Sequence, residues 1–190
     1  MLTFLIGGAR CGKTSFAESR CSHERRVAYV AAACILDKEM AERVLRHRQD
    51  RPAHWITIEE TLAVEAVFCQ ALEEKCDVVL LDCLIAWLSN LLPYHHRRRS
   101  ASAIEEIAPS RTDAIARVAF SGCVIVVSNE VGAGIVPITK VARVFRDLQG
   151  RVNQRMAAAA DRIFFLAAGF HCRSNPRALF SHSGEFDYVF

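Results

Sequence analysis

Residues 2–14 read LTFLI-GGARCGKT, a short apolar run that passes directly into a glycine-rich loop. The loop fits the phosphate-binding pattern G-x-x-x-x-G-K-[ST], which lies between a strand and a helix in the proteins that use it. A dinucleotide-binding fingerprint is excluded here, because G-x-G-x-x-G requires glycine where Ala9 stands. The sequence therefore predicts a strand, a phosphate-binding loop and a helix, with candidate nucleotide-binding residues Gly7, Gly8, Ala9, Arg10, Cys11, Gly12, Lys13 and Thr14.

The chemistry of such a loop needs several kinds of group, and the sequence supplies each of them. Backbone N–H groups turn towards phosphate oxygens, and the start of the helix adds its partial positive charge. Lys13 supplies a cation and is a candidate catalytic residue, while Thr14 offers a hydroxyl to Mg²⁺. Asp82 follows the apolar run Val78–Leu81, where a carboxylate would complete the metal site. Asp82 would serve equally well as the N-cap of a helix that begins after it.

Short β-branched apolar runs alternate with longer stretches of helical spacing along the chain. The predicted strands are Leu2–Ile6, Val27–Ala31, Trp55–Ile58, Val78–Leu81, Val124–Val127 and Ile163–Ala167. The predicted helices are Lys13–Cys21, Asp37–Asp50, Thr61–Lys75, Ser102–Phe120 and Val141–Ala159. This alternation predicts an α/β fold, a mostly parallel sheet with helices on both faces. Pro93–Ser100 and the tail from about His171 are predicted to be irregular, so we expect a domain over residues 1–170 and a C-terminal extension over 171–190.

The amino-acid composition argues against several classes of protein. The chain has 190 residues, 52% of them hydrophobic, and a net charge of +3, which is too small to predict a nucleic-acid or membrane-surface partner. No apolar run approaches the ~18 residues that a membrane span needs, and no signal peptide precedes the first strand, so we expect a cytoplasmic protein. The eight cysteines include no Cys-x-x-Cys pair, which favours reduced thiols over a zinc site.

A basic helix contains a candidate nucleophile. If Asp37–Asp50 is helical, Arg43, His47 and Arg51 share one face at i, i+4 spacing. Neighbouring guanidinium groups lower the proton affinity of an imidazole and can hold phosphate charge beside it. His47 is therefore a candidate catalytic residue. A solvated basic helix face is the alternative that the spacing leaves open.

Another candidate segment follows the apolar run Val124–Val127. Ligands of α/β proteins bind beyond the carboxyl ends of the strands, so Asn129 and Glu130 are candidate substrate-binding residues. Gly132 and Gly134 suggest a tight turn or a close approach to a ligand. An ordinary structural loop is the alternative at this position.

Several blocks, taken together in order and spacing, resemble the adenosylcobinamide kinase / adenosylcobinamide-phosphate guanylyltransferase family of cobalamin biosynthesis. The resemblance covers residues 2 to about 169, which makes it more specific than a phosphate-binding loop alone. The blocks that carry it are Gly7–Thr14, Asp37–Met40, His47–Pro52, Trp55–Glu59, Leu81–Cys83, Ser89–Leu92, Ser128–Pro137 and Phe145–Gln154.

The resemblance implies a bifunctional transferase with a RecA-like P-loop fold. Such an enzyme phosphorylates adenosylcobinamide with ATP or GTP, then transfers GMP from GTP to adenosylcobinamide phosphate and releases pyrophosphate. By the same resemblance His47 becomes covalently guanylylated, and the subunits form a homo-oligomer, a trimer. The resemblance also places in the nucleotide site Ala31, Ala32, Ala33, Arg48, Gln49, Asp50, Arg51, Glu59 and Asp82.

Some positions depart from the family pattern, and three other functions are compatible with the sequence. Cys11 stands where the family commonly has serine, and Ala32 and Ala33 replace residues that often carry hydroxyls. One alternative is a P-loop kinase of another small molecule, in which His47 is structural. A second is a regulatory nucleotide-binding protein, although the sequence has no Asn-Lys-x-Asp guanine motif. A third is a family member that has lost one activity.

Overall fold

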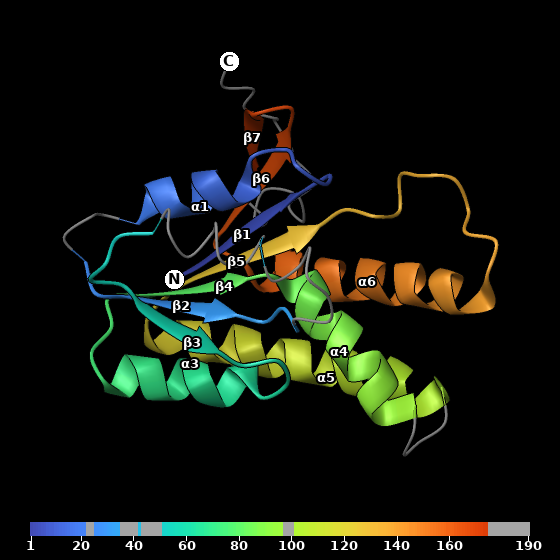
Figure 1. Cartoon of the computed structure of the whole chain (residues 1–190), viewed down its shortest axis with the longest axis horizontal. Coiled ribbons are helices and arrows are strands. Elements are labelled where there is room, and N and C mark those ends of the chain that lie inside the picture. Colours follow the sequence, from blue (N-terminus) through green and yellow to red (C-terminus); the bar gives the residue numbers. More distant parts are fainter. Residues whose placement is uncertain (22–24, 35–41, 43–50, 97–100, 175–190) are drawn as a thin grey trace.

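The computed structural model describes residues 1–21, 25–34, 42, 51–96 and 101–174. Most of the predicted helix Asp37–Asp50, including His47, lies outside the described residues. The described part forms one sheet with helices packed on it (Figure 1), and the phosphate-binding loop begins at the carboxyl end of an interior strand of that sheet.

The sheet has seven strands in the order β3-β2-β4-β5-β1-β6-β7. The strands are β1 (Leu2–Gly7), β2 (Val27–Ala31), β3 (Ile56–Glu59), β4 (Val78–Asp82), β5 (Cys123–Asn129), β6 (Arg162–Ala167) and β7 (Phe170–Ser174). All neighbouring pairs are parallel except β6 and β7. The inner strands are buried on both faces, which is why they appear in the sequence as continuous apolar runs. The predicted mostly parallel sheet is confirmed.

Helices cover both faces of the sheet, as predicted. They are α1 (Lys13–Arg20), α3 (Val64–Glu73), α4 (Leu84–His96), α5 (Ala101–Val118) and α6 (Lys140–Ala159), with a short 3₁₀ turn at Ala119–Ser121. Among these helices, α1 lies on one face and the other four lie on the opposite face (Figure 1). Side chains that alternate along each strand point to opposite faces, so Phe4 and Val30 join the core under the four helices, while Leu5 and Tyr29 join the core under α1.

Two segments differ from the sequence prediction. Pro93–Ser100 was predicted to be irregular, but α4 continues through Pro93 to His96. The apolar turns of α4 that contain Leu84, Leu88 and Leu91 are buried under the sheet, and this packing outweighs the unfavourable effect of a proline near the end of the helix. The tail was predicted to be irregular from about His171, but Phe170–Ser174 forms β7, whose backbone pairs with β6.

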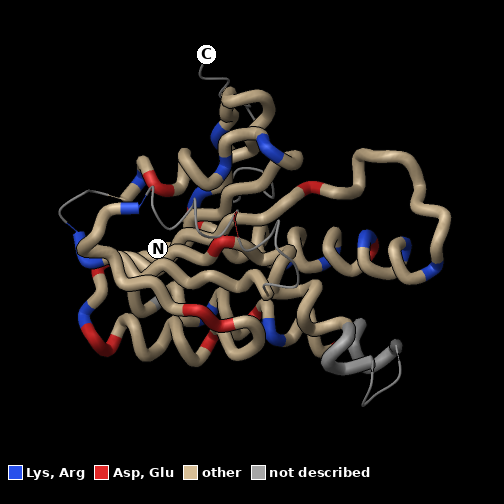
Figure 2. The backbone as a smooth tube through the Cα atoms, viewed as in Figure 1, with Lys and Arg blue, Asp and Glu red and all other residues tan. Residues whose placement is uncertain are grey.

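Lys and Arg residues are interspersed with Asp and Glu along the backbone of the described residues (Figure 2). Positive residues recur along α6, at Lys140, Arg143, Arg146, Arg151 and Arg155, and Arg155 pairs with Asp113 of α5 at 2.7 Å. In the part of the chain that the structure describes, no helix combines the length and the apolar character that crossing a bilayer requires.

Candidate phosphate-binding site

The phosphate-binding loop begins at a glycine that has no room for a side chain. A Cβ added to Gly7 would lie 2.1 Å from the carbonyl oxygen of Leu166 and 2.9 Å from Cys11 Sγ. At the other end of the loop, Gly12 has φ +94° and is the N-cap of α1, a conformation that glycine adopts without strain. The predicted strand, loop and helix are therefore all present, in the order that the motif requires.

Lys13 lies folded into the loop rather than in solvent. Its side chain is 6% exposed, and its ammonium group donates to the carbonyls of Gly7 at 3.0 Å and Gly8 at 2.6 Å. Cys11 Sγ is a further neighbour, 3.5 Å from Lys13 Nζ. A phosphate oxygen in this loop would offer the same ammonium group a charged acceptor, which makes a stronger hydrogen bond than a neutral carbonyl does.

Asp82 lies beside the loop, as the sequence predicted for a metal-linked carboxylate. It ends β4, and its Oδ2 atom accepts a hydrogen bond of 3.1 Å from the Thr14 hydroxyl. The same oxygen accepts a second hydrogen bond, of 2.5 Å, from the Tyr29 hydroxyl. Leu84 begins α4 directly after the cis peptide bond that joins Asp82 to Cys83. The hydrogen bond from Thr14 shows that the carboxylate is turned towards the loop.

Tyr29 is a site residue that the sequence did not single out. Burial, and in addition the Asp82 carboxylate, raises the pKa of the phenol well above its ordinary value, so Tyr29 keeps its proton and acts as the donor. The guanidinium carbon of Arg51, a predicted nucleotide-binding residue, lies 3.3 Å from the centre of the Tyr29 ring. The available sequence signal was one hydroxyl inside the otherwise apolar strand Val27–Ala31.

The ends of β2, β3 and β4 lie side by side at the same edge of the sheet. Ala31 is in register with Glu59 of β3 on one side and with Asp82 of β4 on the other. Three predicted nucleotide-binding positions from separate parts of the sequence are thus brought together by parallel pairing. Burial, and in addition the Asp82 carboxylate, raises the pKa of the Cys83 thiol to about 12, so this neighbour stays neutral.

A side-chain amide secures the loop that follows β2. Asn90 of α4 donates to the carbonyl of Ala32 at 2.7 Å and to that of Thr61 at 3.2 Å. Ala32 is buried and Ala33 is half-buried, so this part of the predicted nucleotide segment is held through its backbone. The sequence missed this role of Asn90, although the residue lies in the block Ser89–Leu92 that contributed to the family resemblance.

Asn129 and Glu130 lie next to the phosphate-binding loop, as expected for residues at the end of β5. The Glu130 N–H donates to the carbonyl of Gly7 at 2.9 Å. The Glu130 carboxylate instead accepts from the Gly132 N–H, so it stabilises its own turn. The carbonyl of Asn129 accepts from Asn153 of α6 at 3.0 Å. Both residues thus have structural contacts in addition to their predicted substrate role.

A metal ion beside the phosphate-binding loop would need oxygen ligands from the substrate in addition to those of the protein. Among the described residues, no group of at least three His, Cys, Asp or Glu side chains is arranged to hold a metal ion. Thr14 and Asp82 provide a hydroxyl and a carboxylate in direct contact. This donor set fits Mg²⁺, which proteins commonly bind through one or two side chains together with the phosphates of a nucleotide.

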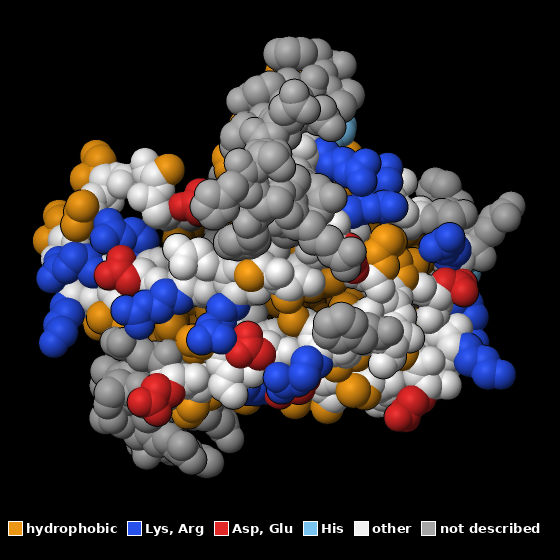
Figure 3. Space-filling model, turned by 180° about the vertical axis from the view of Figure 1, so that it is seen from behind, with side chains coloured by type: hydrophobic (Ala, Val, Ile, Leu, Met, Phe, Trp, Pro, Cys, Tyr) orange, Lys and Arg blue, Asp and Glu red, His pale blue; other side chains and the backbone are white. Residues whose placement is uncertain are grey.

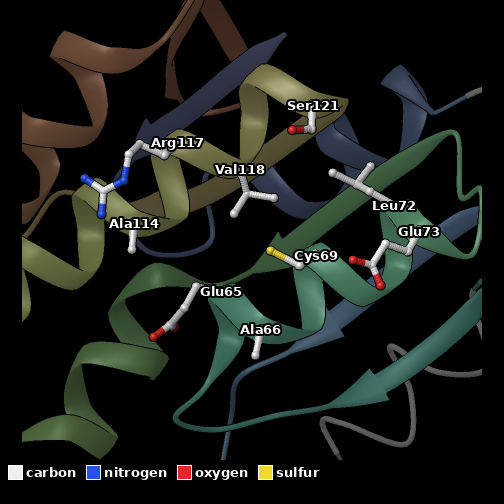
Figure 4. A pocket seen from close by; sticks show the side chains of 9 residues that line it. All are labelled: Glu65, Ala66, Cys69, Leu72, Glu73, Ala114, Arg117, Val118 and Ser121. Carbon is white, nitrogen blue, oxygen red and sulfur yellow. The ribbon is translucent and has the colours of Figure 1, made fainter.

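Other predicted site residues are not placed. His47, Arg48, Gln49 and Asp50 lie outside the described residues. A separate groove lies between α3 and α5, lined in part by Glu65, Cys69 and Arg117 (Figure 4). It contains none of the predicted site residues.

Comparisons with solved structures give weak similarities. A KaiC-like protein from Pyrococcus horikoshii aligns with a TM-score of 0.45 and 8% identity, over 92% of this chain and 78% of that one. The P4 protein of bacteriophage phi6 in complex with ADP aligns with a TM-score of 0.46 and 14% identity, over 90% of this chain and 53% of that one.

Comparisons of sequence are more specific. The bifunctional adenosylcobalamin biosynthesis protein CobU of Salmonella typhimurium is 38% identical, over 89% of this chain and 97% of the relative. CobU of Escherichia coli is 37% identical, with the same two coverages. The protein CobP of Pseudomonas aeruginosa is 36% identical, over 89% of this chain and 94% of the relative. The model of the cobinamide kinase / cobinamide phosphate guanyltransferase family matches residues 3–173, and the chain belongs to that family.

Proposed function

We propose that this protein phosphorylates adenosylcobinamide with ATP or GTP and then transfers GMP from GTP to adenosylcobinamide phosphate. The products of the second step are adenosylcobinamide-GDP and pyrophosphate. The observation that carries the proposal is the match to a family described as both kinase and guanyltransferase over residues 3–173. The sequence alignments with the relatives that are named as bifunctional proteins cover nearly the whole length of those relatives.

The phosphate-binding loop would hold the nucleotide for this chemistry. Lys13 is already buried against the loop carbonyls, and in the proposal its ammonium group binds phosphate oxygens and stabilises the negative charge of the transition state. Gly7, Gly8, Ala9, Arg10, Cys11, Gly12 and Thr14 provide the surrounding backbone and hydroxyl. Glu59 and residues 31–33 are proposed to contact the nucleotide, because β2 ends beside Asp82 at Ala31 and β3 ends beside β2 at Glu59.

The proposed guanylyl transfer uses His47 as the nucleophile. An imidazole nitrogen attacks the α-phosphorus of GTP, a P–N bond forms, the bond to the bridging oxygen breaks, and pyrophosphate leaves. A phosphate oxygen of adenosylcobinamide phosphate then attacks the same phosphorus and the P–N bond breaks, which restores the histidine. Dividing one difficult transfer into two steps is the usual benefit of covalent catalysis. Arg48, Gln49, Asp50 and Arg51 are proposed to hold the nucleotide beside His47.

We propose Mg²⁺ as the assisting ion, held through phosphates or water by Thr14 and Asp82, whose side chains are in contact. When bound, such an ion neutralises phosphate charge. Asn129 and Glu130 lie beside the loop and are proposed to face the substrate or to support that edge. Because the reactions consume ATP and GTP, the proposal includes a cytoplasmic location.

We also propose a homo-oligomer, a trimer by family resemblance. A feature that supports self-association is the segment between β5 and α6, which extends away from the sheet (Figure 1) and carries hydrophobic side chains on the surface (Figure 3). Ile135 and Ile138 are 97% and 96% exposed, and Val136 and Val141 are also exposed. Contiguous exposed apolar residues of this kind mark interaction surfaces.

The decisive experiment is mass spectrometry of the intact protein after incubation with GTP and Mg²⁺. The wild type is expected to gain one GMP in an acid-labile form, because phosphoramidates of histidine hydrolyse in acid. His47→Ala should gain none. His54→Ala, which removes an exposed histidine a short distance along the chain, is the matched control and should gain GMP as the wild type does.

Turnover separates the two activities. The wild type should release a nucleoside diphosphate in the presence of adenosylcobinamide, and pyrophosphate in the presence of its phosphate. Diphosphate release without any protein-bound GMP would overturn the guanylyltransferase half of the proposal and favour a kinase. GTP binding without either product would overturn both halves.

A further inference from the structure

Tyr29 lies between two parts of the proposed site that are far apart in the sequence. Its hydroxyl donates to Asp82 Oδ2 at 2.5 Å, and its ring lies under the guanidinium group of Arg51, 3.3 Å away. The same Asp82 oxygen accepts from Thr14. A continuous line of contacts therefore runs from Arg51 through Tyr29 and Asp82 to the phosphate-binding loop.

The register of the sheet explains why this position reaches Asp82. Tyr29 of β2 is in register with Leu80 of β4, so Asp82 is two residues further along the neighbouring strand. Residues two apart on a strand face the same side, and such diagonal neighbours lie roughly 7–8 Å apart, within reach of an aromatic side chain. A tyrosine spans this gap with its hydroxyl at the carboxylate, whereas phenylalanine would fill the same space without a donor.

The ring of Tyr29 has a different neighbour from its hydroxyl. Tyr29 is also in register with Thr57 of β3, and Arg51 Nη1 donates to Thr57 Oγ1 at 3.4 Å. Arg51 therefore lies over β2 and β3, with its guanidinium group over the Tyr29 ring. Arg51 is four residues after His47, so the Tyr29 ring contacts the end of the segment that contains the proposed nucleophile.

The core under α1 holds the Tyr29 side chain in a fixed position. The side chain is 2% exposed and packs in the core under α1 together with Leu80 and Trp55. A buried aromatic ring has few rotamers available, so its hydroxyl has a defined position. Asp82 is half-buried and faces the loop. The buried Tyr29 side chain thus orients the more exposed Asp82 carboxylate.

We propose that Tyr29 is a positioning residue: its hydroxyl holds the Asp82 carboxylate against Thr14, and its ring holds Arg51 in the same site. The inference rests on the proposed nucleotide site but goes beyond the family match, which gives Tyr29 no role. Tyr29 itself touches neither substrate nor metal. It acts through Asp82 on Mg²⁺-dependent nucleotide binding and through Arg51 on the segment that contains His47.

Calorimetric titration with GTP, in proteins that all carry His47→Ala so that no GMP is transferred to the chain, tests the role of the hydroxyl. Four proteins are compared in this background, the otherwise wild-type chain, Tyr29→Phe, Asp82→Asn and the double variant, each in excess Mg²⁺ and in EDTA. Tyr29→Phe keeps the ring against Arg51 and removes only the hydroxyl. The matched control is Tyr94→Phe, the same chemical change in α4, which should bind GTP like the wild type.

We expect Tyr29→Phe to weaken GTP binding about tenfold in Mg²⁺, the lower end of the effect of a hydrogen bond to a charged group. In EDTA the affinity should stay within about twofold of the wild type, because Asp82 then has no metal to bind. In the Asp82→Asn background the tyrosine substitution should change the affinity by less than about twofold. That non-additive result is one that general damage to the fold would not give.

Three results would overturn the inference. One is wild-type affinity of Tyr29→Phe in Mg²⁺. Another is an equal loss of affinity in Mg²⁺ and in EDTA. The last is a full tenfold loss from Tyr29→Phe in the Asp82→Asn background, since the hydroxyl would then act on something other than the carboxylate.

A second measurement applies if Tyr29→Phe does not fold with the wild-type melting temperature. The chain has three tyrosines, so 3-fluorotyrosine labelling gives three fluorine NMR signals, which Tyr94→Phe and Tyr188→Phe assign. The Tyr29 signal should shift when Mg²⁺ is added to the GTP-bound protein, and should not shift in Asp82→Asn. A Tyr29 signal that does not shift when Mg²⁺ is added would overturn the inference.

Neither measurement needs cobinamide turnover or the histidine adduct, so failure of the proposed function would be recognised separately.

Discussion

Single residues of the phosphate-binding loop are constrained by backbone contacts as much as by ligand chemistry. Cys11, where the family commonly has serine, is 7% exposed and lies beside Lys13. The carbonyl of Cys11 accepts from the Gly169 N–H at 3.1 Å, so the turn between β6 and β7 supports the loop. The thiol fits the position without displacing the backbone pattern of the motif, and the departure from serine leaves the loop intact.

Replacing Gly7 by alanine should damage both stability and nucleotide binding. The new methyl group would lie 2.1 Å from the carbonyl oxygen of Leu166, and this backbone atom in β6 cannot move without disturbing the sheet. We expect a loss of about 3 kcal/mol or more in the free energy of unfolding, measured by urea denaturation. Gly134→Ala, where a Cβ has no neighbour within 4 Å, is the control. A Gly7→Ala protein as stable as this control would contradict the prediction.

At the level of elements, α6 is joined to the end of β5 by buried polar side chains. The Ser128 hydroxyl donates to Asn153 Oδ1 at 2.7 Å, and Gln149 Nε2 donates to both of these groups. Asn153 in turn holds the carbonyl of Asn129. The Glu130 N–H, next along the chain, donates to the carbonyl of Gly7. The polar cluster therefore helps to fix the backbone beside the phosphate-binding loop. Local patterns in the sequence give no sign of this cluster, because its members come from two separate elements.

Substituting Asn153 by alanine should therefore destabilise the protein and weaken nucleotide binding together. The change removes a donor and an acceptor, leaves the buried Ser128 hydroxyl without its acceptor, and takes one of the two acceptors of Gln149 Nε2 away. We therefore expect a loss of about 3 kcal/mol in the free energy of unfolding. The control is Gln154→Ala, the adjacent and exposed position on α6, which should stay within about 0.5 kcal/mol of the wild type. Thermal and urea denaturation measure both, and equal stability of the two variants would refute the assignment.

At the level of the whole molecule, the sheet and its helices form one body from which the segment before α6 projects. Residues 132–136 are all exposed, and Glu130 stabilises only the first turn of the segment. The Thr139 hydroxyl caps α6 by accepting from the Ala142 N–H at 3.3 Å. The segment is therefore anchored at both ends while its apolar side chains face outward.

A double substitution of Ile135 and Ile138 by serine should weaken self-association. Both side chains are almost completely exposed, so the change removes no core contact and the melting temperature of the single subunit should be retained. Light scattering during size-exclusion chromatography should show a mass that falls towards that of one chain at micromolar concentration. Ala133→Ser in the same segment is the control. An unchanged mass for the double variant would place the subunit interface elsewhere.

Periodicity and motif spacing were enough to predict strands β1 to β6 to within about two residues at their ends, and the same holds for α1 and the start of α6. They were not enough for α4 or β7. Pro93 and the polar composition of His171–Ser174 favour irregular structure locally, while burial of α4 and backbone pairing with β6 favour regular structure. Long-range contacts outweighed local propensity in both places.

The sequence by itself determined the parts of this protein that depend on neighbouring residues along the chain. These are the alternation of strands and helices, the phosphate-binding loop of residues 7–14, and Asp82 at the end of an apolar strand. Only the tertiary structure decided which strands lie side by side, and hence that Tyr29 meets Asp82 and that Asn153 supports Asn129. The physical reason is that strand order and register are set by packing of the whole sheet, which no local period along the chain encodes.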